Sequence, residues 1–172
     1  MKFKLWRLIK ILLQQLVLIL AVLIGMNYLQ GRNSISGVSP PAQLVDLKGG
    51  AFEFPAKDTN KVKIVYFFAP WCGVCRLSMG NLNVIQDYLP NVSVQVVALD
   101  YESQEEVSQF VQDLNIRVPV AFGSESVRNA WRIEAYPSYF VLGRDNAIGS
   151  SSLGYSSQLG MILRVLWVSW FQ

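Results

Sequence analysis

The segment Trp71-Cys72-Gly73-Val74-Cys75 contains the only two cysteines of this 172-residue chain. It follows a strongly apolar run at residues 62–70, in which positions 64–68 are all β-branched or aromatic, a composition typical of a buried strand. After Cys75, apolar residues recur at near-helical spacing and predict a helix from about residue 72 to residue 89. These residues are Leu77, Leu82, Ile85 and Leu89. The cysteine pair is therefore expected at a strand-to-helix turn.

This position favours redox chemistry. Cys72 is expected near a helix N-terminus, where free N–H groups and the helix dipole favour an anion such as a thiolate. A cysteine whose pKa is lowered in this way is nucleophilic at neutral pH. A second thiol three residues later can attack a mixed disulfide and release the partner. The alternative is an inert structural disulfide, although so short a loop gives little entropic stabilisation.

Composition excludes several other functions. The chain has no histidine, which excludes Ser-His-Asp and Cys-His catalysis and every His-ligated metal site. Two cysteines cannot complete a tetrahedral zinc site, but two soft thiolates suit a two-coordinate Cu(I) ion, which stays open as an alternative. We expect no metal and no cofactor. Four of the 15 basic residues precede residue 11, leaving 11 against 12 acidic residues. This balance does not favour nucleic-acid binding.

The four early basic residues flank an apolar stretch without ionised groups at residues 11–29. Its length is close to the ~20 residues that a transmembrane helix needs. The positive-inside rule places the basic tail, residues 1–10, in the cytoplasm and the rest of the chain on the far side. A cleaved signal peptide is the main alternative, but no small-x-small site follows. A buried core helix is a weaker one. Residues 30–41, rich in Gly, Ser and Pro, are expected to form an extended, mobile linker.

Residues 42–172 alternate strand and helix patterns. Two strands around Lys48-Gly49-Gly50 predict a hairpin, and Ser103 with Glu106 matches a helix capping box. The order predicts a mixed α/β sheet with helices on both faces. The expected elements after the first helix are a strand at 92–99, a helix at 103–114, an extended piece at 118–122, a helix at 124–131, strands at 139–142 and 147–150, and a helix at 156–170.

Two motifs carry a family resemblance. Phe68-Ala69-Pro70-Trp71-Cys72-Gly73-Val74-Cys75 resembles the active-site turn of the thioredoxin superfamily, and Ala135-Tyr136-Pro137-Ser138-Tyr139-Phe140 resembles its second signature, a proline before a core strand. The resemblance covers nearly all of residues 42–172. The N-terminal hairpin, the insertion carrying residues 103–114 and the single anchor are similar to the TlpA/ResA/DsbE-like branch, which includes ScsD-like proteins.

The resemblance implies roles for the site residues. Cys72 becomes the attacking, partly exposed thiol and Cys75 the buried resolving thiol. Pro137 would be cis, with Tyr136 offering backbone groups to an extended substrate segment; a trans proline that opens an edge strand is the alternative. The supporting residues are Pro70, which kinks the strand end, Gly73 and Val74, which tune the redox potential, and Trp71, which shields the sulfurs or contacts a partner.

The sequence also departs from the family. The positions matching Tyr66 and Ser78 carry an acid in thioredoxin and in many TlpA-like proteins, respectively, and this chain has neither. The proton acceptor for Cys75 is therefore unassigned. Glu134 is a candidate, against the plainer interpretation of a solvated surface charge. The apolar residues from Ile162 to Phe171 in the last helix are expected to pack in the core. Contact with a bilayer is the alternative for the terminal Trp170 and Phe171.

The resemblance implies a thiol–disulfide oxidoreductase anchored in the bacterial inner membrane, with its domain in the periplasm. It implies a reductant of protein disulfides, recharged by a membrane donor of the DsbD or ScsB type. A disulfide-introducing oxidase is one alternative. A Cu(I)-binding or scaffold module is another.

Overall fold

The computed structural model describes residues 35–57 and 60–171, with Trp6, Lys10, 13–19 and Ala21 nearer the N-terminus. The chain divides into two compact units, Met1–Ser34 and Ile35–Gln172. Much of the predicted membrane span, residues 11–29, lies outside the described residues, although positions 13–19 are helical. Among the described residues, no helix has both the length and the apolar character needed to cross a bilayer.

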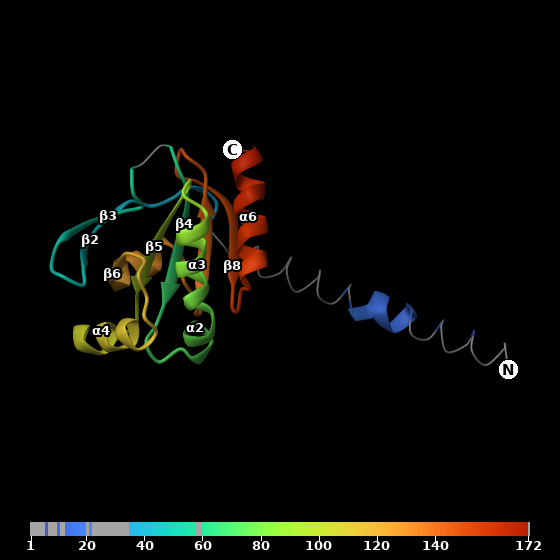
Figure 1. Cartoon of the computed structure of the whole chain (residues 1–172), viewed down its shortest axis with the longest axis horizontal. Helices are drawn as coiled ribbons and strands as arrows, with labels where there is room; N and C mark the ends of the chain where they lie inside the picture. The colour runs from blue at the N-terminus through green and yellow to red at the C-terminus, as the bar shows by residue number, and fades with distance from the viewer. Residues whose placement is uncertain are drawn as a thin grey trace. The chain divides into compact units, whose positions relative to one another are not determined.

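The second unit is built on one eight-stranded sheet within the described residues (Figure 1). Strands β4 and β5, and likewise β5 and β6, are parallel, and the other neighbouring strands are antiparallel. Across the sheet the strands are β1 (Gly37–Val38), β8 (Ala147–Leu153), β7 (Ser138–Leu142), β4 (Val62–Phe68), β5 (Val92–Ala98), β6 (Val120–Phe122), β2 (Ala42–Asp46) and β3 (Ala51–Phe54).

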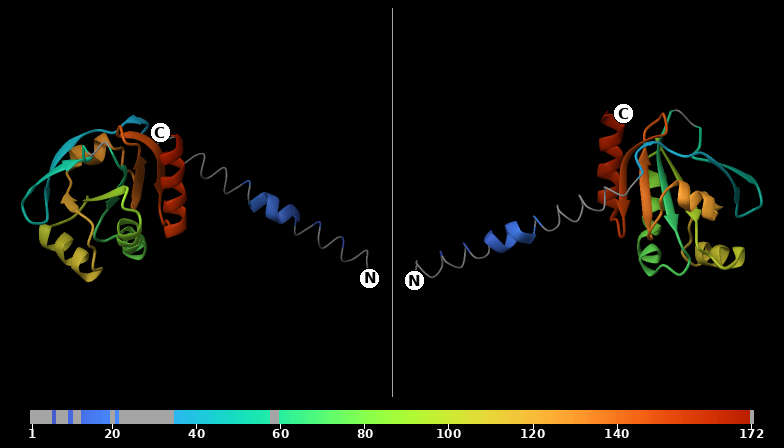
Figure 2. Two further views of the ribbon diagram at one scale, coloured as in Figure 1. Left: turned by 45° about the horizontal axis from the view of Figure 1, so that its top comes forward. Right: turned by 180° about the vertical axis from the view of Figure 1, so that it is seen from behind.

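Strand β4 divides the core into two layers, because its successive side chains point to opposite faces. Ile64, Tyr66 and Phe68 belong to the first layer, and Val65 and Phe67 to the second. The first layer is covered by α3 (Gly80–Tyr88), α4 (Gln104–Asp113) and α6 (Gln158–Phe171), and the second by α5 (Glu125–Ala130) (Figure 2). The predicted mixed sheet with helices on both faces is confirmed.

The prediction of a single helix for residues 72–89 is wrong in one respect. The segment forms two helices, α2 (Gly73–Ser78) and α3, which are separated at Met79. The Ser78 hydroxyl donates a hydrogen bond of 2.9 Å to the Val74 carbonyl. A serine that bonds back to the preceding turn bends a helix, and the glycine at position 80 makes this break easier. The helix that begins at the cysteine pair therefore ends at Ser78, and a second helix begins at Gly80.

Residues 35–41 also differ from the prediction of a mobile linker over 30–41. They belong to the folded unit, where Gly37 and Val38 pair with β8 and the Ser39 amide donates to the Asn146 carbonyl at 3.0 Å. Gly37 has a φ of +90°, which glycine adopts without steric cost. The chain thus joins the sheet at the edge formed by β1 and β8.

The remaining elements follow the predictions closely. The β2–β3 hairpin is present, with the Asp46 carboxylate accepting from the Lys48 and Gly50 amides at 2.8 Å each. At the start of α4 the Ser103 hydroxyl accepts from the Glu106 amide at 3.1 Å, as a capping box requires. The reciprocal bond is displaced by one residue, because the Glu106 carboxylate accepts from the Glu102 amide.

Candidate active site

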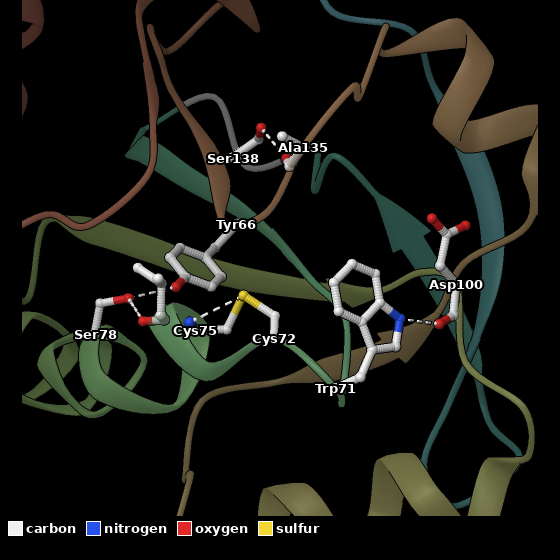
Figure 3. The surroundings of a disulfide bond; sticks show 9 residues. Tyr66, Trp71, Cys72, Cys75, Ser78, Asp100, Ala135 and Ser138 are labelled. Atoms are coloured by element: carbon white, nitrogen blue, oxygen red, sulfur yellow. Dashed lines mark hydrogen bonds between the residues drawn. A yellow bond between two sulfur atoms is a disulfide. The ribbon is translucent and has the colours of Figure 1, made fainter.

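Cys72 and Cys75 form a disulfide at the turn between β4 and α2, the position that the sequence predicts (Figure 3). Cys72 is the N-cap of α2, and its Sγ accepts a hydrogen bond of 3.1 Å from the Cys75 amide. Its own amide donates to the Ala69 carbonyl at 3.0 Å, which closes the turn after the buried Pro70. This geometry gives Cys72 an N–H donor that stabilises a thiolate.

The two sulfur-bearing residues differ in exposure. Cys72 keeps 6% of its surface accessible, whereas Cys75 is completely buried in the first core layer. The two residues between them, Gly73 and Val74, are exposed. A partner can therefore approach the pair only from the side of Cys72, because Cys75 is covered by the protein.

Trp71 is 65% exposed, yet hydrogen bonding fixes its ring beside the disulfide (Figure 3). Its Nε1–H donates to the Asp100 carbonyl at 2.9 Å, and its ring meets the ring of Tyr136 edge-on at 5.7 Å between centroids. The Asp100 carboxylate in turn lies 3.7 Å from the Arg128 guanidinium. Burial, and then the neighbouring Asp100 carboxylate, raise the pKa of Tyr136 above its ordinary value.

Asp100 is a site residue that no motif in the sequence indicated. A usable signal existed, because Asp100 follows the end of β5, and β5 runs parallel to β4 with Ala98 beside Phe68. The carboxyl ends of adjacent parallel strands meet at one edge of a sheet, where sites are commonly built. Asp100 also has a φ of +49°, a left-handed conformation that is uncommon for a residue other than glycine.

Pro137 is brought to the same end of the sheet by strand register. Ser138, the first residue of β7, pairs with Phe67 near the end of β4. The Tyr136–Pro137 peptide bond is cis, as the family resemblance implies, rather than the trans alternative. The Ser138 hydroxyl donates to the Ala135 carbonyl at 2.8 Å and closes this loop (Figure 3). The two predicted motifs, 62 residues apart from Cys75 to Pro137, thus meet in space.

The two positions that lack the family's acids are in contact with each other. The Tyr66 and Ser78 hydroxyl oxygens are 2.8 Å apart, and both residues are completely buried. Ser78 uses its one proton for the Val74 carbonyl, so the Tyr66 hydroxyl is the donor to Ser78. Tyr66 shares its core layer with both cysteines (Figure 3). Burial raises the pKa of Tyr66 well above its ordinary value, so the pair is neutral at physiological pH.

Glu134 does not take part in this arrangement. It is exposed and makes none of the hydrogen bonds or ion pairs found among the described residues. This favours the plainer interpretation of Glu134 as a solvated surface charge. Across the residues that the structure describes, no group of three or more His, Cys, Asp or Glu side chains is placed to hold a metal ion.

Comparison with known proteins places the chain in a family. Residues 37–151, which include the whole cysteine turn and the Pro137 loop, match the AhpC/TSA family. The chain belongs to the AhpC/TSA family. A thioredoxin-like protein from Haemophilus influenzae is 23% identical to this AhpC/TSA protein over 129 residues, which cover 74% of this chain and 75% of the relative.

Solved structures confirm the fold. A thiol:disulfide interchange protein from Chlorobium tepidum has a TM-score of 0.68 at 20% identity, covering 78% of this chain and 97% of that one. StoA from Bacillus subtilis has a TM-score of 0.64 at 19% identity, covering 74% and 97%. A secreted Mycobacterium tuberculosis disulfide oxidoreductase homologous to E. coli DsbE has 0.65 at 17% identity, covering 73% and 94%. The fold of this AhpC/TSA protein is thioredoxin-like.

The family, the fold and the paired cysteines together define the class of enzyme. A cysteine pair that opens and closes a disulfide transfers two electrons to or from another dithiol. On a thioredoxin-like fold of the AhpC/TSA family, this pair makes the protein a thiol–disulfide oxidoreductase.

Proposed function

We propose that this protein is a membrane-anchored, extracytoplasmic oxidoreductase that reduces disulfides in protein substrates. One observation carries the proposal. The Cys72–Cys75 disulfide lies at an exposed turn, with Cys72 at the surface and Cys75 behind it. This is the arrangement that an attacking thiol and a resolving thiol require.

The reaction begins with the dithiol form. The Cys72 thiolate attacks one sulfur of a substrate disulfide, a Cys72–substrate bond forms, and the other substrate sulfur leaves as a thiolate that takes up a proton. Cys75 then loses its proton and attacks the Cys72 sulfur. The Cys72–Cys75 disulfide closes, and the second substrate thiol is released. The substrate gains two electrons and two protons, and the protein loses them.

The neighbouring residues position the substrate. An extended segment of the partner can pair with the backbone at Tyr136 and Pro137, as peptides do when they add to a strand. Trp71 presents an exposed, hydrogen-bonded ring beside the disulfide and offers the partner a rigid apolar contact. Pro70 lies just after the end of β4 and precedes the turn. The backbone of Gly73 and Val74 connects the two cysteines and so positions the Cys75 N–H that donates to the Cys72 sulfur.

The proposed location follows from the sequence. The basic residues 1–10 and the apolar stretch 11–29 support a single-pass anchor in the bacterial inner membrane, with a cytoplasmic N-terminus and a periplasmic domain. A reductant in that compartment must itself be reduced again after each cycle. The proposed donor is therefore a membrane protein of the DsbD or ScsB type, which carries electrons across the bilayer.

Two measurements test the proposal. In the first, Cys75→Ser should accumulate a mixed disulfide with a protein substrate and Cys72→Ser should not, because Cys72 keeps 6% of its surface accessible and Cys75 none. Full insulin-reduction activity in Cys72→Ser would refute the assignment. In the second, equilibration of the pair with glutathione should give a potential near or below roughly −270 mV, as for thioredoxin. A value near roughly −120 mV, as for DsbA, would make the protein an oxidase and reverse the direction.

A further inference from the structure

Helix α6 is apolar on all sides. From residue 146 to residue 172 the sequence contains one charged residue, Arg164. The inner face of α6 packs in the first core layer through Met161, Val165 and Val168, which are all buried. A helix that is hydrophobic all round is normally covered on every side. The side of α6 that faces away from the core therefore requires an explanation.

The other side of α6 is exposed, so the expectation that Trp170 and Phe171 pack in the core is wrong. We define the outer face of α6 as the exposed residues Leu159, Leu163, Leu166, Trp167 and Trp170. Their spacing of three or four residues places them on one face of the helix. Trp170 is 83% exposed, and the Trp167 ring contacts the ring of Phe171 at 4.4 Å between centroids. A continuous apolar surface of this kind marks an interaction site.

The charge distribution favours lipid as the occupant. The Arg164 guanidinium donates to the Ser150 hydroxyl at 3.0 Å and to the Ser151 carbonyl at 3.1 Å, so it is directed toward β8. The outer face therefore has no charged side chain, whereas a typical protein–protein interface has a polar rim. Leucine and tryptophan together are typical of a helix that lies in the bilayer interface.

The position of α6 in the fold fits the same occupant. Helix α6 contacts β8, and β8 pairs with β1, where the chain coming from the predicted membrane span joins the sheet (Figure 1). Residues 30–36 separate that span from β1 and can extend over at most about 25 Å. Ile35 packs against the second core layer, and a tether of this length keeps β1 within about 25 Å of the proposed span.

The tryptophans lie at the pole of the domain away from the cysteines. Trp170 and Leu166 line a hollow together with Val62, the first residue of β4, and with the exposed Arg144. The cysteines follow the last residue of β4, and a strand of seven residues is about 20 Å long. The cation of Arg144 beside Trp170 suits the anionic headgroups of a membrane surface.

We propose that the outer face of α6 lies in the interfacial layer of the membrane that residues 11–29 cross, and so makes a second, peripheral attachment. The attachment lays α6 along the membrane surface, from Leu159 near the start of α3 to Trp170 at the opposite end, beside Val62. This inference rests on the proposed anchor.

The experiment uses the full chain in vesicles of phosphatidylcholine and phosphatidylglycerol, prepared with and without bromine on the acyl chains. Fluorescence of the wild type minus that of Trp167→Phe/Trp170→Phe isolates the emission of the two outer-face tryptophans. The matched control is the wild type minus Trp71→Phe, because Trp71 is 65% exposed but lies at the catalytic turn. Acrylamide in the aqueous phase is the second quencher.

Most of the Trp167/Trp170 emission should be lost in brominated vesicles and resist acrylamide, whereas the Trp71 emission should show the reverse. Trp167/Trp170 emission that acrylamide quenches and brominated lipid does not would overturn the inference. Protection from both quenchers would also overturn it, because a protein, such as a second copy of this chain, would then cover the face. If the full chain fails to float with the vesicles, the anchor itself is wrong. Flotation without lipid quenching refutes only the α6 attachment.

Discussion

Removing the two hydroxyl groups of the buried Tyr66–Ser78 pair one at a time should give unequal losses of stability. In Ser78→Ala the Tyr66 hydroxyl remains completely buried but loses its partner at 2.8 Å. In Tyr66→Phe the Ser78 hydroxyl keeps its bond of 2.9 Å to the Val74 carbonyl, so no buried donor is left without an acceptor. The two variants delete the same hydrogen bond but leave different groups behind.

The magnitudes follow from that difference. Leaving a buried donor unsatisfied costs about 1–3 kcal/mol, whereas losing a hydrogen bond with no orphaned group costs about 0.5–1.5 kcal/mol. Ser78→Ala should therefore lower the free energy of unfolding more than Tyr66→Phe. In the double variant the orphaned tyrosine hydroxyl is gone, so its loss should be close to that of Tyr66→Phe alone. The coupling energy between the two positions should then equal the loss in Ser78→Ala alone, about 1–3 kcal/mol.

The assay is urea unfolding of the unit Ile35–Gln172, which contains the whole sheet and both core layers. The protein is kept oxidised, and the fluorescence of the buried Trp131 reports unfolding. Equal losses in the two single variants would refute the assignment of Tyr66 as the donor. So would strictly additive losses in the double variant, because independent residues show no coupling.

Four further predictions concern the pH dependence of Tyr66 and substitutions at Gly123, Gly80 and Trp71. Burial raises the pKa of Tyr66 above its usual value near 10, so above about pH 10 the unfolded chain loses a proton that the folded protein keeps. The free energy of unfolding should then fall by up to about 1.4 kcal/mol per pH unit for this residue, and urea titrations of Tyr66→Phe should show a shallower decline. Gly123→Ala places a Cβ atom 2.6 Å from the Leu99 side chain, so urea unfolding should show a loss of about 1–3 kcal/mol. Gly80→Ala, where no neighbouring atom lies within 4 Å of the new Cβ, should instead gain about 0.4–1 kcal/mol, because alanine restricts the unfolded chain. Trp71→Ala should slow disulfide exchange with insulin several-fold but leave exchange with glutathione unchanged, and equal slowing of both would argue against a role in partner contact.

The sequence predicted the features that depend on local pattern. The apolar run at residues 62–70 predicted β4, and a change of period after Cys75 predicted a helix, because a buried strand and an amphipathic helix have different spacings. The Ser103 cap was predictable for the same reason, since capping involves residues close in sequence. The strand β1 was not, because it has two residues and lies in a segment rich in Gly, Ser and Pro.

The contacts within the site depend on the register of the sheet, which a single sequence does not specify. The break at Met79 arises from a serine that bonds to its own helix and to a tyrosine on β4, twelve residues earlier. The contact of Asp100 with Trp71 likewise depends on β5 lying parallel to β4. Sequence patterns therefore identified the cysteine turn, and the family resemblance identified the proline loop. The side chains that support the turn required the three-dimensional arrangement.

The surroundings of the disulfide also bear on the direction of electron flow. A strong oxidant of this kind is one whose reduced form is specially stabilised, as happens when several donors or cations hold the attacking thiolate. Here Cys72 Sγ accepts from the Cys75 amide. Arg76, the basic residue nearest in sequence, is 3.9 Å from the Asp113 carboxylate and lies over the Phe110 ring. On the inner side, the neutral Tyr66–Ser78 pair adds no positive charge. Among these neighbouring groups, Arg76 is engaged with Asp113 and Phe110, and this agrees with the proposal that the pair gives electrons to its substrates.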